Sequence, residues 1–175
     1  MEIKKITVGA LQTNCYLLID DGEAVIVDPG DEAPRIIGEV VKTGARVKSI
    51  VNTHDHFDHT GANADLERAF GLKITKLKDG EVLAAGGSKL KIVRTPGHTP
   101  ESVCLFGDGF VISGDTLFED GFGRTDLDGG SNEKMAASLK KLDKLIPEGV
   151  TVYPGHGNIF KYAKGMTAEW LDYLN

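Results

Sequence analysis

The segment His54-Asp55-His56-Phe57-Asp58-His59 places four side chains that bind metal ions within six positions, directly after the apolar stretch at residues 50–53. In an extended chain, residues two apart point the same way, so His54 and His56 can bind one ion together. Asp58 and His59 fall where the chain bends into an expected helix, which turns them toward a neighbouring ion. Imidazole and carboxylate groups are ligands that zinc, iron and manganese accept. This density favours a metal centre over a set of exposed loop histidines.

Three further loops repeat this arrangement of an apolar stretch followed by a metal-binding side chain. His98 follows residues 92–97, Asp115 follows residues 110–114 and His156 follows residues 150–155. Loops that leave one edge of a sheet are held by a rigid scaffold, which can aim distant side chains at one point. The chain has five histidines in all, and each of them lies in such a loop. We therefore expect the three loops to converge on the 54–59 segment.

The bulk properties indicate an ordinary globular protein. A length of 175 residues predicts one domain, residues 1–175, and 41% hydrophobic with 26% charged residues is typical of a soluble chain. No apolar run approaches the ~20 residues that cross a bilayer, and the first residues lack the apolar stretch of a signal peptide. The net charge of −6 argues against a nucleic-acid surface. We expect a cytoplasmic protein with neither membrane nor nucleic acid as partner.

Short apolar stretches alternate with amphipathic ones, so the sequence predicts strands covered by helices. The expected strands are residues 3–8, 15–19, 24–27, 47–52, 73–76, 89–94, 102–106, 110–112 and 150–153. The expected helices are residues 33–42, 61–69, 132–145 and 167–174. The helix at 132–145 has the clearest signals, with Ser131 as its cap and Met135, Leu139 and Leu142 as a core-facing stripe. Two cysteines in apolar stretches, Cys15 and Cys104, read as reduced core residues.

The ordered motifs resemble the metallo-β-lactamase superfamily. They are VDPG at 27–30, HDHFDH at 54–59, GH at 97–98, GDT at 114–116 and PGH at 154–156, and together they span most of the chain. The resemblance implies an α/β (α+β) fold, a four-layer αββα sandwich with a dinuclear site at one edge.

The resemblance also implies that seven residues bind two divalent metal ions, zinc first, with iron or manganese as alternatives. The first ion would be bound by His54, His56 and His98, the second by Asp58, His59 and His156, and Asp115 would bridge the two. Asp28 would orient the ligand loop, although a turn-forming function in Asp28-Pro29-Gly30 fits it equally well.

Within the superfamily, GDTLF at 114–118 and GRTDL at 123–127 look like the short glyoxalase II-type hydrolases. This likeness predicts a thioesterase that cleaves a small acyl-thiol of the S-lactoylglutathione type. Arg124 matches a basic residue that glyoxalase II enzymes present to the substrate, and its alternative is an ion pair with Asp126 or Asp128. The chain ends about 19 residues after His156 (175 − 156), too few for the helical domain that helps longer relatives hold glutathione. The identity of the thiol therefore stays open.

The expected mechanism uses a hydroxide that bridges the two ions and attacks the carbonyl of a thioester or ester. A bound metal ion lowers the pKa of water from ~15.7 to near ~7, so no side-chain base is required. Asp58 and Asp115 are the catalytic carboxylates, because they partly offset the charge of the ions and leave enough positive charge to stabilise an oxyanion.

Other functions remain open on the same residues. A persulfide dioxygenase would bind one iron at His54, His56 and His98 or Asp115, but those enzymes typically carry Ala-His where this chain has Gly155-His156. A lactonase or a weak β-lactamase could use the same dinuclear centre. A metal that only stabilises the fold is the least expected, because seven ligands exceed the four of a structural zinc site.

Overall fold

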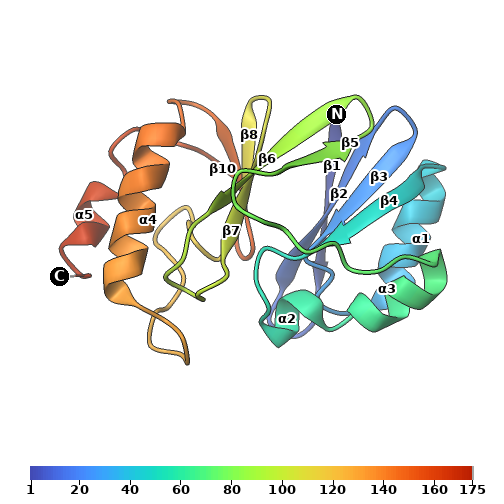
Figure 1. The fold of residues 1–175 in the computed structure, drawn as a ribbon, viewed down its shortest axis with the longest axis horizontal. Coiled ribbons are helices and arrows are strands. Elements are labelled where there is room, and N and C mark those ends of the chain that lie inside the picture. The colour runs from blue at the N-terminus through green and yellow to red at the C-terminus, as the bar shows by residue number, and fades with distance from the viewer. Residues whose placement is uncertain (175) are drawn as a thin grey trace.

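The computed structural model describes residues 1–174 and consists of two β-sheets with helices on both outer sides (Figure 1). The first sheet has the strand order β1-β2-β3-β4. Its strands are β1 (Glu2–Val8), β2 (Thr13–Asp20), β3 (Glu23–Val27) and β4 (Arg46–Val51). The second sheet has the order β10-β9-β8-β7-β6-β5. Its strands are β5 (Val82–Ala85), β6 (Ser88–Arg94), β7 (Val103–Gly107), β8 (Phe110–Gly114), β9 (Thr151–Pro154) and β10 (Phe160–Lys161).

The helices lie on the two outer sides of this pair of sheets (Figure 1). Helices α1 (Ala33–Thr43) and α3 (Asn63–Phe70) cover the first sheet, and α4 (Asn132–Leu145) and α5 (Ala168–Leu171) cover the second. The short α2 (Phe57–Thr60) lies at one edge, between β4 and α3. No helix of the described chain combines the length and the apolarity that a bilayer span requires.

Three apolar clusters separate the four layers, and β2 shows how one strand supplies two of them. Successive strand residues point to opposite faces of a sheet. Accordingly, Leu17 packs toward α1 and α3 in one cluster, whereas Tyr16 and Leu18 pack toward the second sheet in another. The third cluster lies between the second sheet and α4, where Met135 packs near Val111. This order of layers confirms the predicted αββα sandwich.

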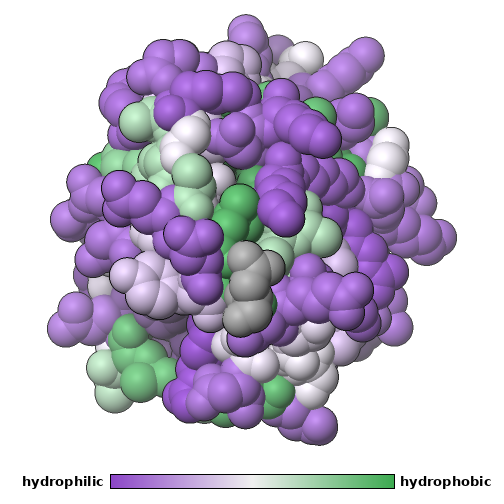
Figure 2. Space-filling view, turned by 90° about the vertical axis from the view of Figure 1, so that its left-hand side faces the viewer, coloured by the Kyte–Doolittle hydropathy of each residue, from purple (hydrophilic) through white to green (hydrophobic). Residues whose placement is uncertain are grey.

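Helix α4 follows the sequence prediction at both ends. The Ser131 side chain accepts a hydrogen bond from the backbone N–H of Lys134, which caps the helix, and Met135, Leu139 and Leu142 are buried. The outward face carries exposed lysines such as Lys140. Figure 2 shows this side of the molecule, which is mostly hydrophilic. The apolar stripe of α4 therefore serves the core, as expected.

Several predicted elements differ in the structure. Residues 73–76 form no named strand but make a single bridge, Ile50 to Ile74. The predicted helix 61–69 begins later, as α3 at Asn63, and the short α2, which was not predicted, precedes it. Between the two helices, Gly61 lies so close to Gly30 that an added Cβ would be 2.3 Å from its carbonyl oxygen, and the Ala62 N–H bonds to the Pro29 carbonyl oxygen. The predicted helix 167–174 is limited to α5. Strands β5 and β10 were not predicted from the sequence, and both are short.

The strand directions bring the predicted site loops to one edge of the sandwich. Strands β3 and β4 are parallel, and so are β8 and β9. The carboxyl ends of each pair therefore lie at the same edge, where His54 follows β4, Asp115 follows β8 and His156 follows β9. Strand β6, which precedes His98, is antiparallel to β7, and β7 is antiparallel to β8, so β6 points the same way as β8.

Candidate metal centre

The structure brings all seven predicted ligands together at this edge. Three groups have ligand atoms that lie within 4.8 Å of one another. They are His54, His56 and His98; His54, His59 and Asp115; and Asp58, His59 and His156. Because the groups share His54 and His59, they form one continuous cluster built from four separate loops.

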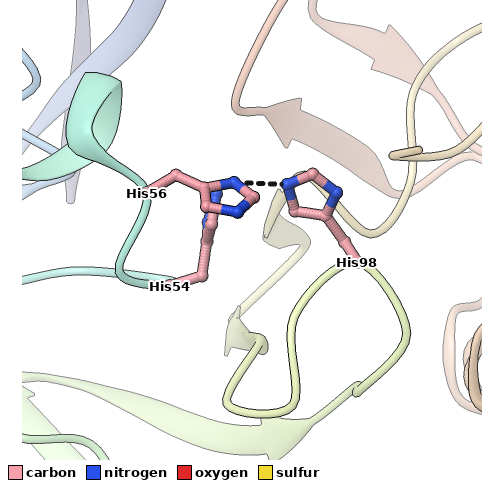
Figure 3. A group of neighbouring side chains, drawn as sticks. All are labelled: His54, His56 and His98. Atoms are coloured by element: carbon pink, nitrogen blue, oxygen red, sulfur yellow. Dashed lines mark hydrogen bonds between the residues drawn. The ribbon is translucent and has the colours of Figure 1, made fainter. Parts of the chain in front are cut away.

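The first group consists of three imidazoles that face one another (Figure 3). The Nδ1 atom of His56 lies 2.8 Å from the Nε2 atom of His98, and the rings of His54 and His98 are edge to face, with centroids 4.9 Å apart. His54 and His56 come from the loop between β4 and α2, whereas His98 comes from the loop after β6. We call this group, His54, His56 and His98, the first subsite.

The second group mixes one carboxylate with two imidazoles. The Oδ2 atom of Asp58 lies 3.2 Å from the Nε2 atom of His156 and 3.5 Å from the Nε2 atom of His59. The two Nε2 atoms are themselves 3.3 Å apart. We call this group, Asp58, His59 and His156, the second subsite.

The carboxylate of Asp115 lies between the two subsites. Its Oδ2 atom is 3.6 Å from the Nε2 atom of His98 in the first subsite and 3.5 Å from the Nε2 atom of His156 in the second. Its Oδ1 atom is 3.4 Å from the Nε2 atom of His59. This position suits a carboxylate that contacts two ions at once.

Orphaned polar atoms test whether a metal ion fits here. The buried Nε2 atom of His54 and the buried Oδ1 atom of Asp115 have no hydrogen-bond partner in the described chain. Buried polar atoms are rarely left without a partner, because desolvation without compensation is costly. Both atoms belong to the ligand groups given above, and imidazole with carboxylate suits zinc, iron or manganese. The residues therefore fit divalent metal ions.

Nearby carboxylates favour positive charge at His59, whereas burial disfavours it at His54. Burial lowers the pKa of His54 to about 2, which keeps its imidazole neutral. Burial also acts to lower the pKa of His59, but the carboxylates of Asp28 and Asp115 outweigh burial and raise the pKa to about 10. For Asp58, burial acts to raise the pKa, yet the hydrogen bond from His156 and the charge of His59 bring it below its usual value. A proton or a metal ion can supply this positive charge.

Asp28 combines both functions that the sequence left open for it. It has a left-handed backbone with φ of 52°, as a turn residue can. Its Oδ1 atom accepts a 2.7 Å hydrogen bond from the Thr53 N–H, and its Oδ2 atom accepts one of 2.7 Å from the Thr53 hydroxyl. The same Oδ2 atom faces the Nδ1 atom of His59 at 3.1 Å, although the alignment falls short of a hydrogen bond. Asp28 therefore orients the ligand loop.

Each of three ligand histidines has its second ring nitrogen next to an oxygen outside the cluster. The Nδ1 atom of His54 lies 3.0 Å from the Thr53 hydroxyl, which itself donates to Asp28. The Nδ1 atom of His98 lies 2.7 Å from the Arg124 carbonyl oxygen. The Nδ1 atom of His156 lies 3.1 Å from the Leu11 carbonyl oxygen. If each Nδ1 carries the proton, each Nε2 atom offers its lone pair to the cluster.

The side chain of Arg124 lies apart from the seven ligands. It is 63% exposed and makes two hydrogen bonds to the Asp126 carboxylate, of 2.7 Å and 2.8 Å. This is one of the two ion pairs that the sequence offered as an alternative to substrate binding. Substrate contact by Arg124 stays a prediction.

Two cavities adjoin the ligand cluster. One, of about 540 Å³, is lined by His54, Asp55 and Lys76, among others. The other, of about 300 Å³, has Leu11, Phe57 and Asp58 in its wall. These volumes are at or near the range of small-molecule sites.

Two phenylalanines that follow Asp115 in the sequence, Phe118 and Phe122, have different environments. Phe118 lines a smaller cavity with His156, and the two ring centroids are 6.4 Å apart. Phe122 instead packs beside Trp170 and belongs to the cluster under α4. Only Phe118 therefore reaches the edge that carries the ligands.

Sequence reasoning missed the residues at the start of β2 that contact the second subsite. The hydroxyl of Thr13 donates a 2.9 Å hydrogen bond to the Oδ2 atom of Asp58. Thr13 and Asn14 are both buried. The available signal was a pair of uncharged polar residues at the head of an apolar strand, which is too common to identify a site.

Comparisons with known proteins agree with this geometry. The model of the metallo-beta-lactamase superfamily matches residues 8–86 and 73–156. The hydroxyacylglutathione hydrolase GloC of Haemophilus influenzae is 32% identical, over 90% of this chain and 92% of the relative. The crystal structure of TTHA1623 in a di-iron-bound form is 33% identical, with a TM-score of 0.80 over 94% of this chain and 96% of that one.

A third likeness concerns the fold alone. ETHE1 from Myxococcus xanthus has a TM-score of 0.86, covering 100% of this chain and 92% of that chain, at 22% identity. The match to the family model and to GloC confirms the resemblance drawn from the motifs. The chain belongs to the metallo-beta-lactamase superfamily.

Proposed function

We propose that this protein is a hydrolase that uses two divalent metal ions to cleave a small acyl-thiol, a thioester of the S-lactoylglutathione type. The observation that carries the proposal is the pair of ligand subsites with Asp115 between them. Seven ligands exceed the four of a closed structural zinc site, so positions remain for water and substrate. The likeness to a hydroxyacylglutathione hydrolase supports a thioester as substrate. Zinc is the first expectation for the ions, with iron or manganese as alternatives.

The chemistry is divided between the ions and the chain. When bound, divalent ions acidify water and polarise a carbonyl group. The chain holds the ligands in place: the Thr53 hydroxyl fixes the Nδ1 side of His54, and the Arg124 carbonyl fixes that of His98. Asp58 and Asp115 contribute the two negative charges that keep the cations at this edge. The five histidines all lie in the cluster or its subsites, so the proposal uses no Ser-His-Asp triad.

The surroundings of Asp58 suit a substrate with an apolar portion. Leu11 is 55% exposed and Phe57 is 75% exposed, and both line the cavity that Asp58 borders. Exposed apolar side chains of this size beside a polar site are suited to binding. Arg124 would contact a carboxylate or carbonyl of the substrate. Its pair with Asp126 is exposed to solvent, where ion pairs contribute little to stability, so exchanging Asp126 for a substrate group costs little.

A persulfide dioxygenase with one iron is the main alternative, and the first subsite alone could hold that ion. Two observations favour the hydrolase. The second subsite supplies three more ligands that a single iron would leave without a function. In addition, a Cβ at Gly155 would lie 2.1 Å from the Oδ1 atom of Asp115. The Ala-His pair of the dioxygenases therefore conflicts with this position of Asp115. A lactonase acting through the same centre is the second alternative.

The test is hydrolysis of S-lactoylglutathione alongside other thioesters and lactones, with metal content measured on the same sample. We expect about two ions per chain and the highest kcat/KM with a thioester. The Asp115→Ala variant should lose both metal and activity. One iron per chain with O₂ uptake on a persulfide would show the dioxygenase instead. An Asp115→Ala variant with full activity and full metal content would defeat the dinuclear proposal.

A further inference from the structure

We propose that the 11–14 segment, which leads into β2, positions the ligands of the second subsite only. Loss of its hydrogen bonds should therefore release one metal ion while the other stays bound. The inference rests on the proposed dinuclear function. It assigns to the first sheet a task that neither the sequence motifs nor the family match indicates. Its basis is a set of hydrogen bonds that connect this segment to Asp58 and to the loop of His156.

Thr13 provides the contact to the carboxylate. Its hydroxyl donates 2.9 Å to the Oδ2 atom of Asp58, the same oxygen that lies 3.2 Å from His156 and 3.5 Å from His59. Thr13 is 1% exposed, so water does not compete for this bond. A carboxylate oxygen can accept two hydrogen bonds or ligand contacts. Thr13 therefore occupies one acceptor position of the Asp58 Oδ2 atom and leaves the other directed toward the two histidines.

Leu11 and Asn14 provide the contacts to the loop of His156. The Leu11 carbonyl oxygen lies 3.1 Å from the Nδ1 atom of His156. The side-chain amide of Asn14 donates 3.0 Å bonds to the carbonyl oxygens of Pro154 and Gly157, one on each side of that histidine. The backbone N–H of Asn14 donates 2.7 Å to the carbonyl oxygen of Gly155. Four hydrogen-bond contacts from one short segment thus determine where His156 points.

This support crosses from one sheet to the other. Asn14 is the second residue of β2 in the first sheet, whereas Pro154 is the last residue of β9 in the second. The Tyr16 hydroxyl adds a 2.6 Å bond to the same Pro154 carbonyl oxygen. The second subsite therefore depends on how the two sheets meet, because Asp58 follows the first sheet and His156 the second.

The first subsite is held by other parts of the chain. The Nδ1 atom of His54 is next to the Thr53 hydroxyl, and that of His98 is next to the Arg124 carbonyl oxygen. Within residues 1–174, the side-chain hydrogen bonds of the 11–14 segment and the Leu11 carbonyl contact reach none of His54, His56 and His98. Changes in the segment should therefore affect the two subsites unequally.

The test is zinc retention by the Thr13→Val variant, which removes the hydroxyl at nearly constant volume. The zinc-loaded protein is equilibrated with buffers of graded free Zn²⁺, and zinc per chain is measured by mass spectrometry. We expect the wild type to show two binding steps. In Thr13→Val, one step should weaken by about 10- to 100-fold, as is typical when a partner of a metal ligand is lost. The other step should stay within about twofold, because its ligands keep their partners.

Two comparisons identify the ion that is lost. Thr13→Ser keeps a hydroxyl and should restore both steps. After loading with Co²⁺, the absorption spectrum of the weakened Thr13→Val protein should match that of His156→Ala and differ from that of His98→Ala. Asn14→Ala serves as the second variant and should weaken the same step, with circular dichroism and thermal melting confirming that each variant is folded.

The possible failures can be told apart. Thr13→Val with both zinc affinities unchanged, or with both reduced equally, would overturn the positioning assignment and leave the dinuclear function standing. A spectrum that matches His98→Ala would also overturn it, because the wrong ion would have been lost. A wild-type protein that binds only one Zn²⁺ would overturn the dinuclear function and this inference together.

Discussion

The Nδ1 atom of His98 lies 2.7 Å from the carbonyl oxygen of Arg124, while the Arg124 side chain points to Asp126. The backbone of this residue thus contacts a proposed metal ligand, while its guanidinium is exposed at the surface. The two contributions can be separated by mutation, because a side-chain substitution keeps the carbonyl group.

Replacing Arg124 with alanine should raise KM for an anionic thioester and leave metal content unchanged. Losing a hydrogen bond to a charged substrate group should raise KM by about tenfold or more. The turnover number should change little, since the lost interaction is made equally in the ground and transition states. Steady-state kinetics and metal analysis measure both quantities. Arg46→Ala, which removes another exposed ion-paired arginine at the far end of β4, is the matched control. Unaltered KM in Arg124→Ala would remove this residue from the substrate site.

Replacing Asp28 with asparagine should weaken metal binding and destabilise the fold. Asparagine tolerates the left-handed backbone and its oxygen can accept one of the two hydrogen bonds that Thr53 donates, but its NH₂ group cannot accept the other. An unsatisfied buried donor costs about 1–3 kcal/mol of unfolding free energy, and losing a partner of metal ligands costs about 10- to 100-fold in affinity. Denaturant unfolding and zinc titration measure the two effects. The exposed Asp55, replaced in the same way, should behave as wild type. Equal behaviour of the two variants would contradict the orienting function of Asp28.

Replacing Gly155 with alanine should displace Asp115. The added Cβ would lie 2.1 Å from the Oδ1 atom of Asp115 and 2.8 Å from the Cε1 atom of His59, so at least one of these side chains must move. If the proposed function is correct, we expect fewer than two ions per chain and loss of most of the proposed thioesterase activity. At Gly121 a Cβ meets no atom of the described chain within 4 Å, so Gly121→Ala is the control. A fully loaded and active Gly155→Ala protein would show that Asp115 can shift without consequence.

The two cysteines should resist thiol reagents in the native protein. Cys15 and Cys104 are free and fully buried. Burial raises the pKa of both thiols, that of Cys104 to about 11, which keeps them in the unreactive protonated form. With Ellman's reagent we expect no rapid reaction at pH 8 in native buffer and two thiols per chain in concentrated guanidinium. Fast labelling of the native chain would mean that the core opens readily around β2 or β7.

The sequence by itself predicted the family, the fold class and seven candidate metal ligands, whose side chains lie together in the structure. Histidine and aspartate recur after apolar stretches, and this pattern is local enough to read along the chain. Helix α4 was equally clear, because its cap and its apolar stripe lie within one continuous segment. The elements missed from sequence had weak local signals: β10 has only two residues, and β5, Val82–Ala85, is not rich in β-branched residues.

The tertiary structure alone decided which residues support each ligand. Thr13 and Asp58 are 45 positions apart, and Asn14 and Pro154 are 140 apart. Their contacts exist only because the two sheets pack face to face and bring the head of β2 beside the end of β9. The sequence does not indicate which group a buried hydroxyl or amide will hydrogen-bond. The pattern of residues along the chain predicts the candidate ligands. The packing of the layers determines which groups orient them.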